Sequence, residues 1–334
     1  MTGSAAKTGR LATVFGGAGF IGRHVVRALA RDGWRIRVAS RRPDLAFHLQ
    51  PLGTPGQIHA VQANLRFPAS VAAALSGADA IVNLPAILAE SGNQTFEGLH
   101  VFGARAVANA AREAGVSAMV HLSAIGADPA AKSLYSASKG RGELAVREAF
   151  PDAVVLRPSI VFGPEDDFFN RFAAMARVLP ALPLIGGGKT RFQPVYAGDV
   201  AEAAAKALAG EIAPGAVLEL GGPEVKTFEE LLRYICAITG RRRLFAPLPF
   251  GAAHLMARGT EIASMLSLGL FPRMLAMTRD QVELLRHDNV VSAAAISENR
   301  TLQGIGIAPA TIEAIVPAYL HRYRKAGQFE RREA

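Results

Sequence analysis

Apolar and polar residues follow two different rhythms along the first half of the chain. Short apolar runs that end in glycine or a polar residue predict strands, and apolar residues three and four positions apart predict helices. Strands are expected at residues 11–15, 35–39, 57–61, 80–84, 118–122 and 154–157, and helices at residues 20–31, 104–114 and 135–150. Strands that alternate with helices predict an α/β protein with a doubly wound parallel sheet, covered by helices on both faces.

This rhythm breaks after about residue 163, where short pieces, prolines and helices follow. The clearest signals there are helices at residues 228–238 and 310–323, and two segments that return to the sheet, 194–208 and 216–220. We therefore predict a sheet domain at residues 10–163, with returns to the sheet near 192–220, and a smaller, mostly helical lobe at residues 164–330.

Length and cysteine content limit the class of protein. The chain has 334 residues, of which 50% are hydrophobic, and this is enough for one large domain or two unequal ones. The single cysteine, Cys236, excludes an intrachain disulfide, lies in an apolar helical pattern, and fits a reducing compartment. Residues 1–10 lack the apolar core of a secretion signal, and no uncharged run reaches the roughly 20 residues of a membrane-spanning helix. We expect a cytoplasmic protein, either free or peripheral on the inner membrane (on the matrix side in a eukaryote).

The net charge of +9 bears on the partners of the chain. It can reflect an arginine-rich surface, a phosphate-binding site, or attraction to an anionic membrane surface. No basic helix with interleaved aromatic residues is visible, so we expect no nucleic-acid partner.

A glycine-rich segment joins the first predicted strand to the first predicted helix. Two spacings overlap there, because Gly17, Gly19 and Gly22 fit G-x-G-x-x-G and Gly16, Gly19 and Gly22 fit G-x-x-G-x-x-G. In both, the early glycines permit a tight turn, Gly19 lets the backbone approach a pyrophosphate, and Gly22 lets the helix pack against the strand. The free N–H groups at the start of the helix then favour the phosphates. The segment predicts a dinucleotide site in a Rossmann domain.

The end of the second predicted strand indicates which dinucleotide binds. Proteins that bind NAD usually place Asp or Glu there to hold the ribose 2′-hydroxyl, whereas this chain has Ser40, Arg41 and Arg42. Either arginine can pair with a 2′-phosphate, Ser40 can donate a hydrogen bond to it, and this stretch contains no carboxylate that repels it. Unless both arginines are ordinary surface residues, the sequence favours NADPH (NADP+) over NAD(H).

Tyr135 and Lys139 lie four residues apart, on one face of a predicted helix. Tyrosine has a pKa of about 10 in water, and a nearby ammonium group can lower that pKa by roughly 1–3, which makes the phenol a usable proton donor or acceptor. The position of this pair after the fifth predicted strand of a glycine-loop domain strengthens the signal. The pair predicts proton transfer to a carbonyl or from an alcohol.

Together these motifs resemble the extended short-chain dehydrogenase/reductase superfamily. Within it, the chain resembles the family of NADPH-binding accessory subunits of respiratory complex I (NADH:ubiquinone oxidoreductase) and their bacterial relatives. The glycine segment and the Tyr135–Lys139 pair are superfamily features, and the resemblance covers nearly the whole chain. The more specific stretches are ATVFG at 12–16, IVNL at 81–84, RPSIVFGPED at 157–166, FFNRF at 168–172, QPVY at 193–196 and PLP at 247–249.

The resemblance implies a role for each matching residue. Arg41 would meet the adenosine 2′-phosphate, Asn64 and Leu65 would flank the adenine, and Pro158 would touch the nicotinamide side. Tyr135 and Lys139 would lie at the nicotinamide ribose, so the pair can serve cofactor binding without catalysis. The whole set of expected cofactor-binding residues is Gly16, Gly19, Phe20, Ile21, Gly22, Ser40, Arg41, Arg42, Asn64, Leu65, Leu84, Pro85, Tyr135, Lys139 and Pro158.

Active members of the superfamily also use a Ser or Thr just after the fifth strand. Ser123 can fill this position, or the position falls on Ala124 and the third catalytic group is missing. If the chain is an enzyme, its expected catalytic residues are therefore Tyr135, Lys139 and Ser123. His100 and His121 stand alone and show no metal-ligand spacing, so we expect no metal site.

Residues 241–243 are all arginine and precede the apolar stretch 244–257, and a second apolar stretch spans 262–271. Such segments can lie in a membrane interface, or can be core helices of the smaller lobe behind a solvated basic loop.

Two functions are consistent with these features. In the first, NADPH is a structural or sensing ligand, and the C-terminal lobe docks on a respiratory complex or on quinone-related machinery. In the second, the chain is an NADP-dependent oxidoreductase or epimerase that acts on a small carbonyl or alcohol with Tyr135 and Lys139. We favour the first.

Overall fold

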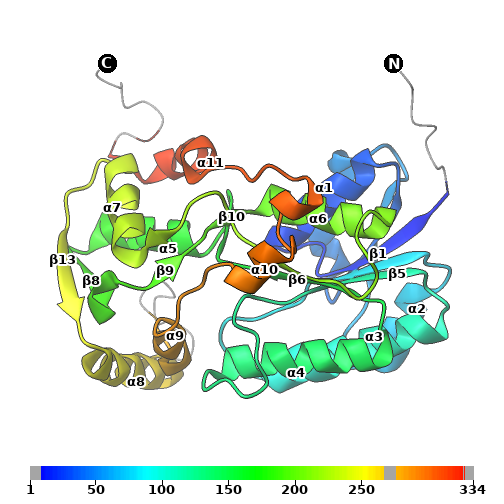
Figure 1. Ribbon diagram of the computed structural model, residues 1–334, viewed down its shortest axis with the longest axis horizontal. Coiled ribbons are helices and arrows are strands. Elements are labelled where there is room, and N and C mark those ends of the chain that lie inside the picture. The colour runs from blue at the N-terminus through cyan, green and yellow to red at the C-terminus, as the bar shows by residue number, and fades with distance from the viewer. Residues whose placement is uncertain (1–8, 267–275, 326, 328–334) are drawn as a thin grey trace. The chain divides into compact units, whose positions relative to one another are not determined.

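The computed structural model describes residues 9–266, 276–325 and 327. The contacts divide the chain into two compact units (Figure 1). Unit 1 consists of Met1–Pro158, Ala197–Leu220 and Val291–Ala308, and unit 2 of Ser159–Tyr196, Gly221–Val290 and Pro309–Ala334. Each unit is therefore built from segments that lie far apart in the sequence.

Unit 1 contains a seven-stranded sheet with the order β11-β6-β5-β4-β1-β2-β3, in which all neighbours are parallel. Its strands are β1 Leu11–Phe15, β2 Arg35–Ser40, β3 Ile58–Gln62, β4 Ala80–Asn83, β5 Ala118–Leu122, β6 Val154–Pro158 and β11 Val217–Leu220. The predicted doubly wound parallel sheet is confirmed. The strand order reverses between β1 and β4, and in open α/β sheets ligands bind at the carboxyl ends of the strands at such a point.

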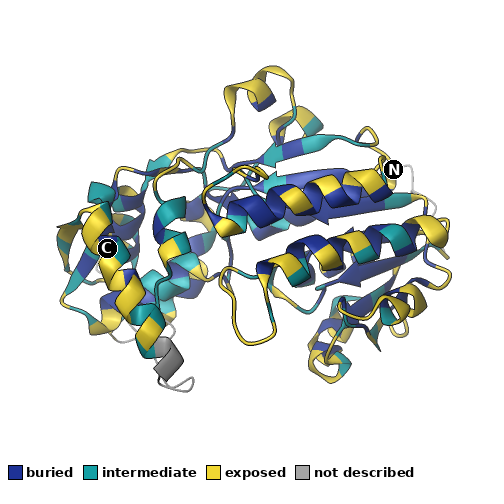
Figure 2. Cartoon of the chain, turned by 90° about the horizontal axis from the view of Figure 1, so that it is seen from below, coloured by how far each residue is buried: buried dark blue, intermediate teal, exposed yellow. Residues whose placement is uncertain are grey.

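Helices cover both faces of this sheet. The helices of unit 1 are α1 Phe20–Arg31, α2 Pro68–Leu75, α3 Gly103–Glu113, α4 Leu134–Ala149, α6 Ala197–Ala209 and α10 Ala293–Ser297, with shorter helices at η1 Pro43–Leu52, η2 Glu97–Phe102 and η4 Gln303–Ile305. Figure 1 shows α1 and α6 on one side of the sheet and α2, α3 and α4 on the other. The strands are buried from both sides, and Figure 2 shows covering helices with one buried and one exposed face.

The segment 291–308 protects the free edge of the sheet in unit 1. Glu219 in β11 donates its backbone N–H to the carbonyl oxygen of Arg300 at 2.9 Å, and the Arg300 guanidinium donates to the carbonyl oxygen of Val217 at 2.8 Å. The Glu219 carboxylate accepts the backbone N–H of Ser292 at 2.7 Å. An edge strand left open invites pairing with other chains, and these contacts occupy it.

Among its described residues, unit 2 combines helices with three two-stranded sheets, which pair β7 with β10, β9 with β12 and β8 with β13. The strands are β7 Val161–Phe162, β8 Ala181–Ile185, β9 Arg191–Phe192, β10 Val195–Tyr196, β12 Lys226–Thr227 and β13 Leu244–Leu248. The helices are α5 Phe168–Val178, α7 Phe228–Ile238, α8 Phe250–Leu266, α9 Arg279–Leu284 and α11 Ile312–Leu320, with η3 Gly186–Gly188 and η5 His321–Tyr323. Its core is rich in aromatic rings, among them Phe162, Phe169 and Phe228.

The basic and apolar region of unit 2 is partly core and partly surface. Ala253 and Ala257 of α8 are buried in a cluster with Ile185 and Val282, whereas Leu255 and Ile262 on the same helix are 73% and 50% exposed. The second apolar stretch of the sequence, 262–271, extends beyond residue 266 and so lies partly outside the described residues. Within the part of the chain that the structure describes, no helix has the length and apolar character needed to cross a membrane.

Candidate functional site

The glycine segment forms the turn between β1 and α1. Gly16 has a φ of 77°, in the left-handed region that favours glycine, and its carbonyl oxygen accepts the N–H of Gly19 at 3.0 Å. A Cβ at Gly22 would lie 2.2 Å from the carbonyl oxygen of Gly16 and 2.6 Å from the Cα of Gly17. Only glycine therefore lets α1 approach the turn this closely.

The start of α1 offers backbone donors beside this turn. The N–H of Arg23 is bonded to the carbonyl oxygen of Gly19 at 3.1 Å, so the N–H groups of Phe20, Ile21 and Gly22 have no acceptor within the helix. The N-cap is Gly19, which has no side chain to cap them. These N–H groups and the positive end of the helix dipole suit an anion.

The other predicted residues follow the carboxyl ends of neighbouring strands. The N–H of Leu84, after β4, donates to the carbonyl oxygen of Phe15 at 3.1 Å, and Pro85 lies against Gly16, where a Cβ would be 3.2 Å from the Pro85 nitrogen. In parallel strands these ends share one edge of the sheet. The structure thus brings the glycine turn and the Leu84–Pro85 segment together.

Ser40, the last residue of β2, and Arg41 and Arg42, which follow it, have different surroundings. Ser40 Oγ accepts the backbone N–H of Arg42 at 3.3 Å, and the Arg42 guanidinium pairs with Asp44 at 2.8 Å. Arg41 is exposed and has no hydrogen bond or ion pair with any other residue that the structure describes. The stretch 40–42 itself contains no carboxylate, as predicted, but Asp44 lies just beyond it and pairs with Arg42.

Asn64 and Leu65 follow β3 and differ in accessibility. Asn64 is half-buried, and its side-chain oxygen accepts the N–H of Arg66 at 3.2 Å. Leu65 is buried and packs against the start of α3, where a Cβ at Gly103 would lie 3.1 Å from its side chain. The Leu65 side chain is therefore part of the core.

Tyr135 and Lys139 both lie on α4, but Lys139 is fixed to the sheet. Its side chain is buried, and Nζ donates to the carbonyl oxygen of Leu122 at 2.7 Å. Burial lowers the pKa of Lys139 to about 8, although the Glu143 carboxylate opposes this shift. Burial raises the pKa of Tyr135 to about 12. The expectation that Lys139 lowers the pKa of Tyr135 is therefore wrong for this arrangement, because desolvation of the phenol dominates.

His100 ties α4 to two other segments. Its Nε2 accepts the N–H of Ile87 at 3.1 Å, so the proton is on Nδ1, which donates to Ser138 Oγ at 2.8 Å. Ser138 Oγ in turn donates to the carbonyl oxygen of Tyr135 at 2.8 Å. The rings of His100 and Tyr135 lie edge to face, with centroids 5.6 Å apart. His100 thus holds the position of Tyr135.

His121 completes a buried polar cluster that we define as Asn83, His100, His121, Ser138 and Lys139. The Asn83 amide nitrogen donates to His121 Nδ1 at 3.1 Å. Burial and the charge of Lys139 lower the pKa of His100 to about 3 and that of His121 well below its usual value. The two histidines look isolated in the sequence, because they are far apart there and only the fold brings them to Lys139.

Ser123 lies one residue beyond the anchor of Lys139. Its side chain is buried, and Oγ has no hydrogen-bond partner among the described residues. The backbone N–H of Ser123 donates to the carbonyl oxygen of Leu156 at 2.7 Å, and Pro158 accepts the N–H of Ile125 at 3.0 Å. Ser123 and Lys139 are therefore brought to the same edge of the sheet as the glycine turn, and α4 places Tyr135 one helical turn before Lys139.

A sequence model of the NAD dependent epimerase/dehydratase family matches residues 12–221. The chain belongs to this family. The match begins in β1 and ends just after β11, so it covers the sheet, the glycine turn and the polar cluster of the epimerase/dehydratase fold.

Two curated relatives are similar to most of this chain. The mitochondrial NADH dehydrogenase [ubiquinone] 1 alpha subcomplex subunit 9 of Arabidopsis thaliana is 32% identical, over 97% of this chain and 81% of its own length. The ceramide reductase of Caulobacter vibrioides is 30% identical, over 85% of this chain and 87% of its own length. The resemblance to accessory subunits of complex I and their bacterial relatives is thus confirmed.

Solved structures agree with the fold of this epimerase/dehydratase family member. The dTDP-glucose 4,6-dehydratase of Streptomyces venezuelae, whose crystal structure holds NAD, has a TM-score of 0.68 and 21% identity, with 94% of this chain and 96% of that chain covered. This likeness supports a Rossmann-like architecture for unit 1.

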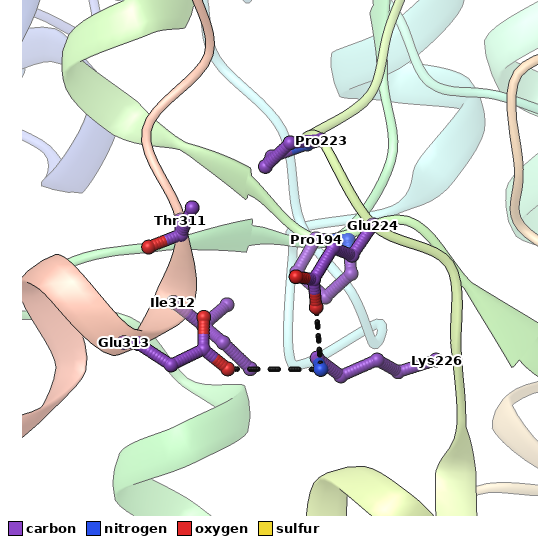
Figure 3. A pocket seen from close by; sticks show the side chains of 7 residues that line it. All are labelled: Pro194, Pro223, Glu224, Lys226, Thr311, Ile312 and Glu313. Atoms are coloured by element: carbon purple, nitrogen blue, oxygen red, sulfur yellow. Dashed lines mark ion pairs between the residues drawn. The ribbon is translucent and has the colours of Figure 1, made fainter.

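A separate pocket of this family member lies in unit 2 and contains none of the predicted site residues. It is lined by Pro194, Pro223, Glu224, Lys226, Thr311, Ile312 and Glu313 (Figure 3). Lys226 points between two carboxylates, with Nζ 2.5 Å from Glu224 and 3.6 Å from Glu313. Its charge is therefore compensated. Among the described residues, no group of three or more His, Cys, Asp or Glu side chains could hold a metal ion.

Proposed function

We propose that this chain binds NADPH at the carboxyl edge of the sheet in unit 1. The observation that carries the proposal is the glycine turn, where a Cβ at Gly22 would overlap the backbone and α1 presents uncapped N–H groups. This cradle fits a pyrophosphate, which needs close backbone approach and donors rather than side chains. The dinucleotide would supply hydride chemistry, and the residues around it would bind and orient it.

The preference for the phosphorylated cofactor rests on Arg41. This side chain is exposed at the end of β2 and pairs with no other described residue, so its guanidinium is available to a 2′-phosphate. We expect Arg41→Ala to weaken NADPH binding by roughly 10- to 100-fold and to leave NADH binding within about twofold, because only NADPH has this phosphate. Calorimetric titration with both nucleotides tests this, and equal loss for the two would refute the assignment.

We propose an accessory role, in which bound NADPH is structural or sensing and the chain associates with a respiratory complex or with quinone-related machinery. Two observations support this role. The similarity to the complex I subunit of Arabidopsis thaliana extends over 97% of this chain. Burial also raises the pKa of Tyr135 to about 12, which makes the phenol a poor acid–base group at neutral pH.

We propose that unit 2 contacts a membrane surface. Leu255 and Ile262 of α8 are exposed, and the net charge of +9 favours anionic lipids. The protein would then be cytoplasmic or peripheral on the inner membrane, on the matrix side in a eukaryote. Co-sedimentation with anionic and with neutral vesicles tests this, and equal binding to both would contradict the electrostatic part.

A second candidate function is that of an NADP-dependent oxidoreductase or epimerase. The buried Ser123 Oγ, which has no partner among the described residues, favours it, because this hydroxyl is left to bond a substrate oxygen. The similarity to a ceramide reductase points the same way.

One experiment separates the two roles. The purified protein is analysed for bound nucleotide and its redox state, and then incubated with NADPH and a panel of ketones and aldehydes. The accessory role predicts reduced NADPH that survives purification and is not consumed. Consumption of NADPH that is lost in Tyr135→Phe would establish the enzyme instead.

A further inference from the structure

The two arginines after β2 differ in what their guanidinium groups can still bind. The Arg42 guanidinium grips Asp44 with two nitrogens, with Nη2 2.8 Å from Oδ2 and Nε 3.2 Å from Oδ1. This forked geometry uses the edge of the guanidinium that would otherwise hold a phosphate through two hydrogen bonds. Arg41 has no such partner among the described residues.

The position of Asp44 links this pair to the choice of cofactor. A carboxylate near the end of the second strand is what NAD-binding Rossmann domains use to hold the ribose 2′-hydroxyl, and it repels a 2′-phosphate. Asp44 lies four residues after Ser40, and its hydrogen bonds with Arg42 hold its pKa below the usual value, so it is ionised at neutral pH. Arg42 compensates this charge.

The local backbone keeps the pair in place. The hydroxyl of Ser40 accepts the N–H of Arg42 at 3.3 Å, which forms a compact turn after the strand. Asp44 lies in the first turn of η1, which begins at Pro43, and a carboxylate is favoured at this end of a helix. The turn and the start of η1 thus bring the two side chains within reach of each other.

We propose that Arg42 selects the dinucleotide indirectly, as the counter-ion of Asp44, and that Arg41 is the group that contacts the 2′-phosphate. This inference rests on the dinucleotide site proposed above and adds a specificity role for Asp44. Arg42 is then a positioning residue, since it acts through Asp44 and not by touching the cofactor.

A double substitution tests the pair. Arg42→Ala leaves the Asp44 carboxylate uncompensated, and we expect it to weaken NADPH binding by about fivefold with NADH unchanged, as is typical of exposed charges. The double variant Arg42→Ala/Asp44→Asn removes both charges, and we expect NADPH affinity to return to within about twofold of the natural protein. The readout is the ratio of the NADPH and NADH dissociation constants, measured by calorimetry at one fixed salt concentration.

The opposite outcome is equally clear. If Arg42 itself contacts the phosphate, the double variant binds NADPH as weakly as Arg42→Ala, and the inference is overturned; an Arg42→Ala variant without any change overturns it too. Arg112→Ala is the matched control, because it removes an exposed arginine from the last turn of α3. Thermal unfolding of each variant confirms that it is folded.

Failure of the inference and failure of the proposed function are distinguishable. If the natural protein binds neither nucleotide, the proposed function fails. If Arg41→Ala weakens NADPH selectively while the double variant is not rescued, the NADPH site stands and only the role of Asp44 is lost.

Discussion

At the scale of single residues, the polar cluster is shaped by burial. Lys139, His100 and His121 lie within one buried group. Burial lowers the pKa of all three, which favours their neutral forms. The two imidazoles are neutral at physiological pH, so the ammonium of Lys139 is not opposed by a second buried positive charge. At acidic pH the free energy of unfolding decreases, because the histidines take up protons when the protein unfolds.

His100 makes the free energy of unfolding of unit 1 depend on pH in the acidic range. Its pKa is about 6.5 in an unfolded chain and about 3 in the fold, so between these values the unfolded state binds more protons, and the contribution of His100 to stability is lost as the pH falls. One such group lowers the free energy of unfolding by about 1.4 kcal/mol for each pH unit by which the pH falls. We expect His100→Asn to have a correspondingly shallower slope between pH 4.5 and 6, measured by urea unfolding at several pH values.

The control for this prediction is His59→Asn. His59 is exposed on β3, so its loss should leave the slope unchanged. An unchanged slope in His100→Asn would mean that His100 already titrates normally in the fold.

At the scale of elements, the close approach of α1 to the turn after β1 requires a glycine at position 22. Gly22→Ala would place a methyl group 2.2 Å from the carbonyl oxygen of Gly16, so α1 must move away. We expect unfolding to become easier by about 1–3 kcal/mol and dinucleotide binding to be lost, because the donors of α1 move with the helix. Circular dichroism during urea unfolding and calorimetric titration measure the two effects.

Gly259→Ala provides the comparison, since a Cβ at this helical glycine of α8 meets nothing within 4 Å. It should be neutral or stabilising by up to about 1 kcal/mol, because alanine has the higher helix propensity. Equal effects at both positions would show that the close approach at Gly22 has no energetic weight.

The elements of unit 1 were largely predictable. Strand β1, helix α1 and strand β5 have the bounds that the hydrophobic pattern predicts, and β2, β3, β4, β6 and β11 differ from their predictions by one residue at one or both ends. The prediction that residues 194–208 return to the sheet is wrong, because Val195–Tyr196 pair with β7 in a separate two-stranded sheet and Ala197–Ala209 form helix α6. Helix α2 was missed, because its alanine-rich sequence has a weak contrast between its faces. The two-residue strands of unit 2 were missed because runs this short carry no periodic signal.

At the scale of the whole molecule, the interleaving of the two units decides what can fold alone. Unit 1 includes α6 and β11 from Ala197–Leu220 and the edge segment Val291–Ala308. A chain cut after residue 196 therefore lacks the helix that packs beside α1 and an edge strand of the sheet. We expect the fragment 1–196 to show no cooperative thermal unfolding, whereas the full chain does.

Differential scanning calorimetry of the fragment and of the full chain measures this. Trp34, which is the single tryptophan and is buried in unit 1, reports the same transition by fluorescence. A sharp transition in the fragment would contradict the view that these later segments complete unit 1.

The sequence by itself determined the doubly wound sheet, the position of the glycine turn and the residues at the carboxyl ends of the strands, because these depend on local periodicity and on glycine at fixed spacings. Only the tertiary structure decided the environments of those residues. It brought His100 and His121 to Lys139 and left Arg41 unpaired among the described residues, whereas the pair of Arg42 with Asp44, two residues away, forms within a local turn. It also reversed the expected shift in the pKa of Tyr135, because desolvation depends on what covers a side chain, and that is set by contacts between distant parts of the chain.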